Sequence, residues 1–131
     1  MEARTPKTPG PDHPITIRAT GERVVVRSNG RVLADSTAAL TLNEAGYPPV
    51  RYIPISDVEQ SLLRATSTST YCPYKGEASY VSVVAPDGEI QDAAWSYEQP
   101  YPAVAAIAGH LAFYPDKVEV VVTAALDRQT I

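Results

Sequence analysis

An Asn-Gly pair between two β-branched runs is the feature that most constrains the fold of this chain. The runs cover residues 23–27 (RVVVR) and 32–36 (VLADS), and Asn29-Gly30 lies between them. Type I′ hairpin turns require a positive φ at both central residues, which Asn and Gly reach more easily than other residues. The sequence therefore predicts an antiparallel hairpin here.

Similar short runs, each ended by a turn signal, recur along the chain. They cover residues 39–42, 50–53, 62–66, 79–84, 89–95, 110–114 and 118–122. β-branched and aromatic residues favour strands, and Pro86-Asp87-Gly88 and Pro115-Asp116 favour turns. We predict a mainly-β fold, a single compact domain of about eight to ten short antiparallel strands, in which the last two runs form a hairpin.

Two segments favour short helices. Pro102 begins and Gly109 follows the alanine-rich residues 103–108, the usual asymmetry of a helix with Pro at its start and Gly after its end. Apolar residues lie nearly all round this helix, which predicts burial. Ser56 and Glu59 have the spacing of a capping box and predict one helical turn over residues 57–61.

The length of 131 residues fits one domain. Residues 1–15 are rich in proline and have no apolar period, so we expect a disordered tail that contains His13. The single domain is expected over residues 16–124, followed by a C-terminal tail over 125–131.

Charge and cysteine content exclude several classes of partner. Eleven Lys and Arg face fifteen Asp and Glu, and the basic residues are scattered, so we expect no nucleic-acid partner. No apolar run is long enough for a membrane span or a secretory signal, so we expect no membrane partner and a cytoplasmic location. The single cysteine excludes an internal disulfide and a four-cysteine zinc site, and we expect no metal and no cofactor.

Chemically rich side chains are concentrated in residues 71–76, 92–97 and 109–114, with a weaker concentration at residues 44–52. Aromatic rings beside a few polar groups are typical of small-molecule sites. The aromatic candidates are Tyr74, Tyr80, Trp95, Tyr97 and Tyr114. Ordinary packing in the core and at its rim is the alternative interpretation.

Two basic residues are candidates for contact with a planar or anionic ligand. Lys75-Gly76 combines an ammonium group with a residue that permits close backbone approach, although a surface turn would look the same. Arg51 could clamp a carboxylate or phosphate, or cover a strand edge. Neither GxxxxGK[ST] nor GxGxxG is present, so the phosphate-loop classes are not supported.

Three residues are candidates for catalysis. Cys72 could act as a nucleophile if Lys75 favours its thiolate, and His110 could act as a base oriented by Asp92. Free cysteine is more often a small buried hydrophobic residue, and a hydrogen-bonded structural histidine is the alternative for His110.

Several ordered motifs of the chain resemble one family. They are the string of residues 72–80 (CPYKGEASY), followed by 92–97 (DAAWSY), 107–110 (IAGH) and 112–114 (AFY), with 34–36 (ADS) and 47–54 (YPPVRYIP) upstream. The chain is similar over roughly residues 22–122 to the bacterial and fungal domain of unknown function 427, which also carries a nucleotidyltransferase-like label.

The resemblance implies a β-tent type fold, the architecture of zinc-bearing chaperone-like modules and methionine sulfoxide reductases. Those proteins carry paired CxxC zinc ligands, whereas this chain has Cys72 alone. Nucleotidyltransferases use paired carboxylates to hold magnesium near a Gly-Ser loop, and here Asp92 alone could hold an ion.

Three functions remain open from the sequence. The first is a small-molecule-binding domain with an aromatic and polar pocket. The second is an enzyme of transferase or hydrolase type that uses Cys72 or His110 with Asp92. The third is a homodimer that associates through an edge strand such as residues 118–122.

Overall fold

The computed structural model describes residues 5–124 and confirms the mainly-β fold. Within that range the chain forms ten strands: β1 (Ile15–Ala19), β2 (Arg23–Ser28), β3 (Arg31–Ser36), β4 (Leu40–Glu44), β5 (Val50–Pro54), β6 (Leu63–Cys72), β7 (Gly76–Ala85), β8 (Gly88–Ser96), β9 (His110–Phe113) and β10 (Glu119–Thr123). Over the same residues, no helix is long and apolar enough to cross a membrane.

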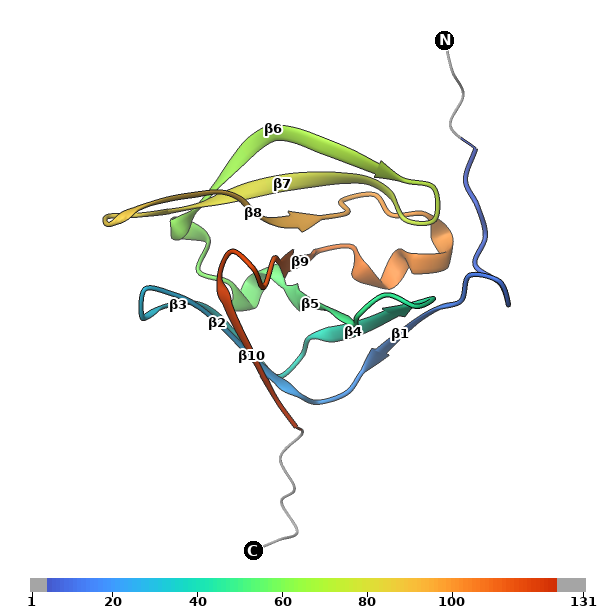
Figure 1. Ribbon diagram of the computed structural model, residues 1–131, viewed down its shortest axis with the longest axis horizontal. Coiled ribbons are helices and arrows are strands. Elements are labelled where there is room, and N and C mark those ends of the chain that lie inside the picture. Colours follow the sequence, from blue (N-terminus) through green and yellow to red (C-terminus); the bar gives the residue numbers. More distant parts are fainter. Residues whose placement is uncertain (1–4, 125–131) are drawn as a thin grey trace, which may run out of the picture.

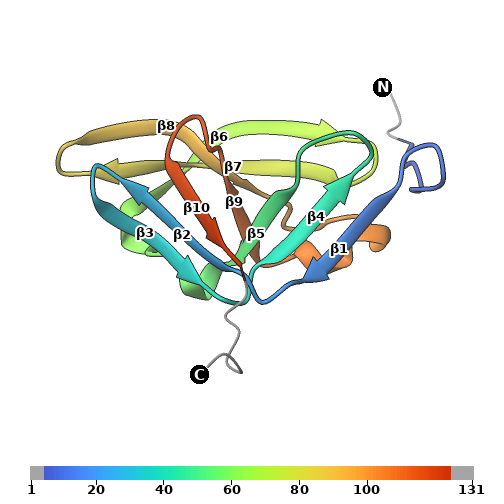
Figure 2. The same cartoon turned by 60° about the horizontal axis from the view of Figure 1, so that its bottom comes forward.

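The strands form two antiparallel sheets. One has seven strands in the order β1-β4-β5-β9-β8-β7-β6, and the other has three in the order β10-β2-β3. In Figure 1 the larger sheet curves, so that β6 and β7 lie above β4 and β1. Figure 2 shows β2, β3 and β10 beside β5, where the smaller sheet closes one side of the molecule. The 125–131 tail lies outside the described residues.

The predicted Asn-Gly hairpin is confirmed. It joins β2 to β3, and Asn29 and Gly30 have φ values of 52° and 77°. On β2 the side chains of Val24 and Val26 are fully buried. They pair in register with Val122 and Val120 of β10. Because alternate residues of a strand share a face, these four valines form one apolar wall.

The predicted hairpin between the last two strands is wrong. β9 lies inside the large sheet, where it pairs with β5 and β8, whereas β10 pairs with β2 in the small sheet. The turn after β9 is closed by backbone hydrogen bonds from Lys117 and Val118 to the carbonyl of Tyr114. This turn carries the chain from one sheet to the other. The turn residues alone do not determine which strands β9 and β10 pair with, because those partners are distant in sequence.

The expected helices are short 3₁₀ segments. The segment Pro102–Ile107 is interrupted at Val104, whose φ and ψ are −124° and 26°. Only Val104 and Ile107 of this segment are buried, and a spacing of three residues matches the period of a 3₁₀ helix. The expected turn over residues 57–61 is instead two such segments, Ile55–Asp57 and Gln60–Leu62, and no side chain caps either.

β6 extends through a polar stretch that looked like a loop in the sequence. Residues 67–70 (STST) belong to this strand, which is an edge of the large sheet. Most of its side chains are exposed, so the strand has no apolar face to signal its presence. The turn from Cys72 to Gly76 and the turn at Pro86-Asp87 agree with the prediction.

Replacement of Gly30 by alanine should destabilise the β2–β3 hairpin. Its φ of 77° is strained for any residue with a Cβ, although the space around it is open. We expect a loss of about 1 kcal/mol in the free energy of unfolding, measured by urea denaturation. Gly46→Ala is the control, because Gly46 also lies in open space but lacks a positive φ. Equal losses in the two variants would contradict the assignment.

Candidate functional site

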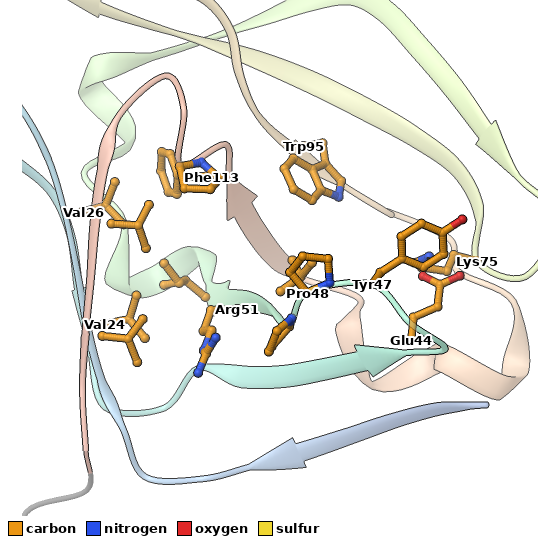
Figure 3. Close-up of a pocket in the computed structure, with 15 residues that line it drawn as sticks. Val24, Val26, Glu44, Tyr47, Pro48, Arg51, Lys75, Trp95 and Phe113 are labelled. Atoms are coloured by element: carbon orange, nitrogen blue, oxygen red, sulfur yellow. The ribbon is translucent and has the colours of Figure 1, made fainter. Parts of the chain in front are cut away.

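Two adjoining chambers form a cavity: the larger is lined by residues of both sheets, and the smaller by residues of the seven-stranded sheet and its connections. The larger chamber has a volume of about 660 Å³ and the smaller one about 210 Å³. Six residues line both: Glu44, Tyr47, Pro48, Val50, Lys75 and Trp95. Figure 3 shows Val24 and Val26 at one end of the larger chamber and Glu44 and Lys75 at the other. The cavity is thus apolar at one end and charged at the opposite end.

A buried ion pair forms the charged end. Lys75 Nζ donates a hydrogen bond of 2.6 Å to Glu44 Oε1, and the two side chains are only 10% and 14% exposed. Glu44 Oε2 accepts a second hydrogen bond of 2.7 Å from His13 Nε2. Glu44 therefore joins the end of β4, the β6–β7 turn and the segment before β1.

The neighbours of Glu44 keep it ionised. Burial raises the pKa of this carboxyl, but hydrogen bonds from Lys75 and His13 outweigh the burial and leave the pKa below its ordinary value. Glu44 is thus a carboxylate at neutral pH, with both oxygens occupied by donors.

The β6–β7 turn holds Lys75 in the buried position. The amide of Lys75 donates to the carbonyl of Cys72, and the carbonyl of Lys75 accepts from the amide of Tyr101. Gly76 follows with a φ of 111°, and a Cβ there would lie 3.5 Å from the carbonyl oxygen of Gln99. That distance is an ordinary van der Waals contact, so it is the positive φ of the turn that favours glycine here.

Trp95 is the largest of the six side chains that line both chambers. Its indole N–H donates to the hydroxyl of Tyr52 over 3.2 Å, and its ring lies 4.4 Å from the ring of Tyr114, centroid to centroid. The hydroxyl of Tyr114 is 3.2 Å from that of Tyr80, which also contacts Thr70. These contacts fix the orientation of the indole plane.

Burial keeps three tyrosine hydroxyls around the smaller chamber protonated, those of Tyr52, Tyr97 and Tyr114. Burial raises the pKa of Tyr52 to about 12. Burial also raises the pKa of Tyr97, and burial together with the hydrogen bond to Tyr80 raises that of Tyr114. Each of these groups is therefore available as a hydrogen-bond donor at neutral pH.

Five residues singled out in the sequence as ligand contacts line the cavity. Lys75 and Trp95 line both chambers, Arg51 lines the larger one, and Tyr97 and Tyr114 line the smaller one. Tyr74 and Gly76 are not among the lining residues. The ring of Tyr74 stacks instead on that of His13 at a centroid distance of 4.0 Å.

Arg51 makes its polar contacts away from the indole. Its guanidinium lies 3.3 Å from the carboxylate of Glu22, and Figure 3 shows it pointing away from Trp95. The Nε atom of Arg51 is buried and has no hydrogen-bond partner within residues 5–124. Arg51 therefore contributes mainly its aliphatic stem to the chamber.

The candidate catalytic residues have separate partners. Asp92 accepts hydrogen bonds from Thr66 and Thr68, which hold its pKa below the ordinary value. The Nδ1 atom of His110 lies 2.8 Å from the carbonyl of Ala108. The Sγ atom of Cys72 lies 3.6 Å from Lys75 Nζ. In the described part of the chain, no hydrogen bond links Cys72, His110 and Asp92.

Sequence reasoning gave no role to several residues of the site. His13 lies in a proline-rich stretch without a motif, so nothing local indicated its bond to Glu44. The valines of β2 and β10 were recognised as strand formers, and those of β10 also as a candidate edge for dimerisation, although their alternation could have indicated a shared face. Glu44 belonged to the weakest candidate segment, because its partner Lys75 is distant in sequence.

The potential metal-ligating side chains of the described residues are not grouped together. Among residues 5–124, no three or more His, Cys, Asp or Glu side chains lie close enough together to hold an ion.

Glu44→Gln should destabilise the protein at neutral pH. The substitution leaves the buried Lys75 ammonium without its counter-charge, so we expect a loss of about 3 kcal/mol in the free energy of unfolding. The pKa of Glu44 is lowered from 4.5 in the folded protein. The ionised Glu44 therefore contributes its full stabilisation to the folded state above pH 4.5, and this stabilisation is lost as the pH falls through the folded-state pKa.

Urea denaturation at several pH values measures both effects. Wild-type protein should lose more stability than Glu44→Gln between about pH 5 and pH 3. Glu98→Gln is the control, since Glu98 is exposed and should change stability by less than about 0.5 kcal/mol. If the free energy of unfolding fell equally with pH in wild type and Glu44→Gln, the ion pair would not be the source of the acid sensitivity.

Comparison with known proteins agrees with the motif resemblance. The model of a family described as a domain of unknown function, DUF427, matches residues 16–124. No curated protein matches the sequence. The match covers well over half of the chain and includes every strand from β2 to β10. The resemblance seen in the motifs is thus confirmed: the chain belongs to the DUF427 family.

Proposed function

We propose that the domain binds a small, largely apolar and planar molecule in the larger chamber. The observation that carries this proposal is the chamber itself, about 660 Å³ between two sheets. Ligand pockets typically have volumes of roughly 300–1,000 Å³ and are lined mainly by apolar and aromatic side chains with a few polar groups. The chamber fits this description in size and lining.

The composition of the walls supports a flat apolar guest. Aliphatic side chains of β2, β5 and β10 line one part, and Phe113 and Trp95 add aromatic faces. Tyr47, Pro48 and Pro49 form the connection between β4 and β5 and line the same chamber. Two adjacent prolines restrict the backbone, so this part of the wall is preorganised.

Binding explains the site better than catalysis does. An acid–base or nucleophilic mechanism needs its groups within hydrogen-bond reach of one another or of a shared substrate. Asp92 is bound by the threonines of β6, and His110 contacts the backbone of Ala108. Neither residue lines the two chambers.

Titration with naphthalene tests the proposal. Trp95 is the only tryptophan, so its indole N–H gives a single resonance in a nitrogen–proton correlation spectrum. We expect this resonance to shift and saturate as naphthalene is added. Native mass spectrometry of freshly purified protein should also show a retained small molecule.

A matched pair of variants locates the binding. Val122 lines the larger chamber, whereas its neighbour Val121 is 36% exposed and does not. Val122→Phe fills part of the space and should weaken naphthalene binding about tenfold or more, while Val121→Phe should leave it unchanged. A Trp95 resonance that never shifts, or equal effects of the two substitutions, would refute the proposal.

A further inference from the structure

The smaller chamber is unusually rich in hydrogen-bond donors. Among its lining residues the hydroxyl-bearing side chains are Tyr47, Tyr52, Tyr80, Tyr97 and Tyr114, and Lys75 adds an ammonium group. The single carboxylate of the lining, Glu44, already accepts from Lys75 and His13. The carboxylate of the lining thus already has a donor on each oxygen, whereas several lining groups can still donate to a guest.

Tyr97 is the clearest unsatisfied donor. The residue as a whole is only 7% exposed, and its hydroxyl forms no hydrogen bond within residues 5–124, but that hydroxyl is not among the fully buried polar atoms without a partner. It therefore keeps access to the chamber that the residue lines. A hydroxyl that faces a small chamber bonds to water there, or to a ligand group that displaces the water. The position of Tyr97 in the lining allows a guest in the chamber to supply that partner.

Two other residues of the lining, Tyr52 and Lys75, have donor capacity that their own contacts do not use up. The hydroxyl oxygen of Tyr52 accepts from Trp95, and its own proton has no acceptor within the described residues. The ammonium of Lys75 has three protons, of which one is directed at Glu44 and a second faces the weak acceptor Cys72 Sγ. Lys75 Nζ also lies 6.0 Å from the centre of the Tyr97 ring.

The remaining hydrogen-bonding capacity of the lining decides which ligand chemistry fits. A hydroxyl can donate or accept, but an ammonium group only donates. A ligand oxygen could accept from Tyr97 and Lys75, whereas a ligand ammonium group would meet a carboxylate, Glu44, whose two oxygens are already bound by Lys75 and His13. The volume of about 210 Å³ equals roughly seven water volumes, which accommodates a small head group but not the body of the ligand.

We infer that the smaller chamber binds the carbonyl or carboxylate end of a ligand whose apolar body occupies the larger chamber, with Tyr97 as the selecting donor. This inference rests on the proposed function, since it requires a guest in the larger chamber. Trp95 and the Glu44–Lys75 pair line both chambers and define the junction between head group and body.

A series of naphthalene derivatives tests the inference. Naphthalene, acetonaphthone, naphthoate and naphthylmethylammonium share one body and differ in their head group. We expect both acceptor probes to bind about tenfold more tightly than naphthalene, measured by calorimetry and by the Trp95 indole resonance. The ammonium probe should bind no more tightly than naphthalene. The ratio of naphthoate to acetonaphthone affinity shows whether an anion or a neutral carbonyl is preferred.

Tyr97→Phe removes one oxygen and keeps the ring. It should abolish the tenfold advantage of the acceptor probes and leave naphthalene binding unchanged. Tyr101→Phe is the matched control, because Tyr101 bonds to Tyr71 and lines neither chamber. Circular dichroism and thermal unfolding verify that both variants fold.

The outcomes separate the two proposals. If naphthalene binds but the acceptor probes gain nothing, or Tyr97→Phe leaves their advantage intact, the inference is overturned and the proposed function stands. If no probe shifts the Trp95 resonance, both fail. A loss of the acceptor advantage in Tyr97→Phe alone supports the inference.

Discussion

The buried ion pair between Glu44 and Lys75 connects parts of the chain that are distant in sequence. Taking two charges out of water is costly, and the cost is offset only where geometry and further hydrogen bonds are favourable. Here the second carboxylate oxygen is bound by His13, whose ring stacks on Tyr74 of the same turn as Lys75. The amide of Lys7 also donates to the carbonyl of Pro73. The N-terminal segment is thereby attached to the turn that carries the cation.

This attachment explains why a cavity persists beside the core. The buried residues form two clusters, one mainly aliphatic around Val24, Val26 and Ile53, and one rich in tyrosine around Tyr52 and Tyr97. Tyrosine hydroxyls and a buried salt bridge have directional requirements that close packing alone cannot satisfy. The space between the clusters therefore stays open where polar groups are held apart by their own bonds.

The sequence predicted local features of the fold well and long-range ones poorly. Asn29-Gly30 and Pro86-Asp87 are turns because φ preferences act within a few residues. The final hairpin was wrong because β9 and β10 could pair with each other or with distant strands, and only the complete sheets decide between them. Exposed β6 carried no apolar pattern. In the site, Lys75 and Trp95 could be identified from the chemistry of their side chains. The role of His13 could not, because it arises from a contact with Glu44, 31 residues away in the sequence.

Trp95 shows how one side chain can couple the two chambers. Its N–H is directed to Tyr52, and its ring packs at 41° against Tyr114, so the indole has little freedom to rotate. A guest in the larger chamber would meet one part of this residue and a head group in the smaller chamber another. In the proposed binding mode a fixed wall could not adapt to either without disturbing the other, so the length of a ligand and the position of its oxygen would be selected together.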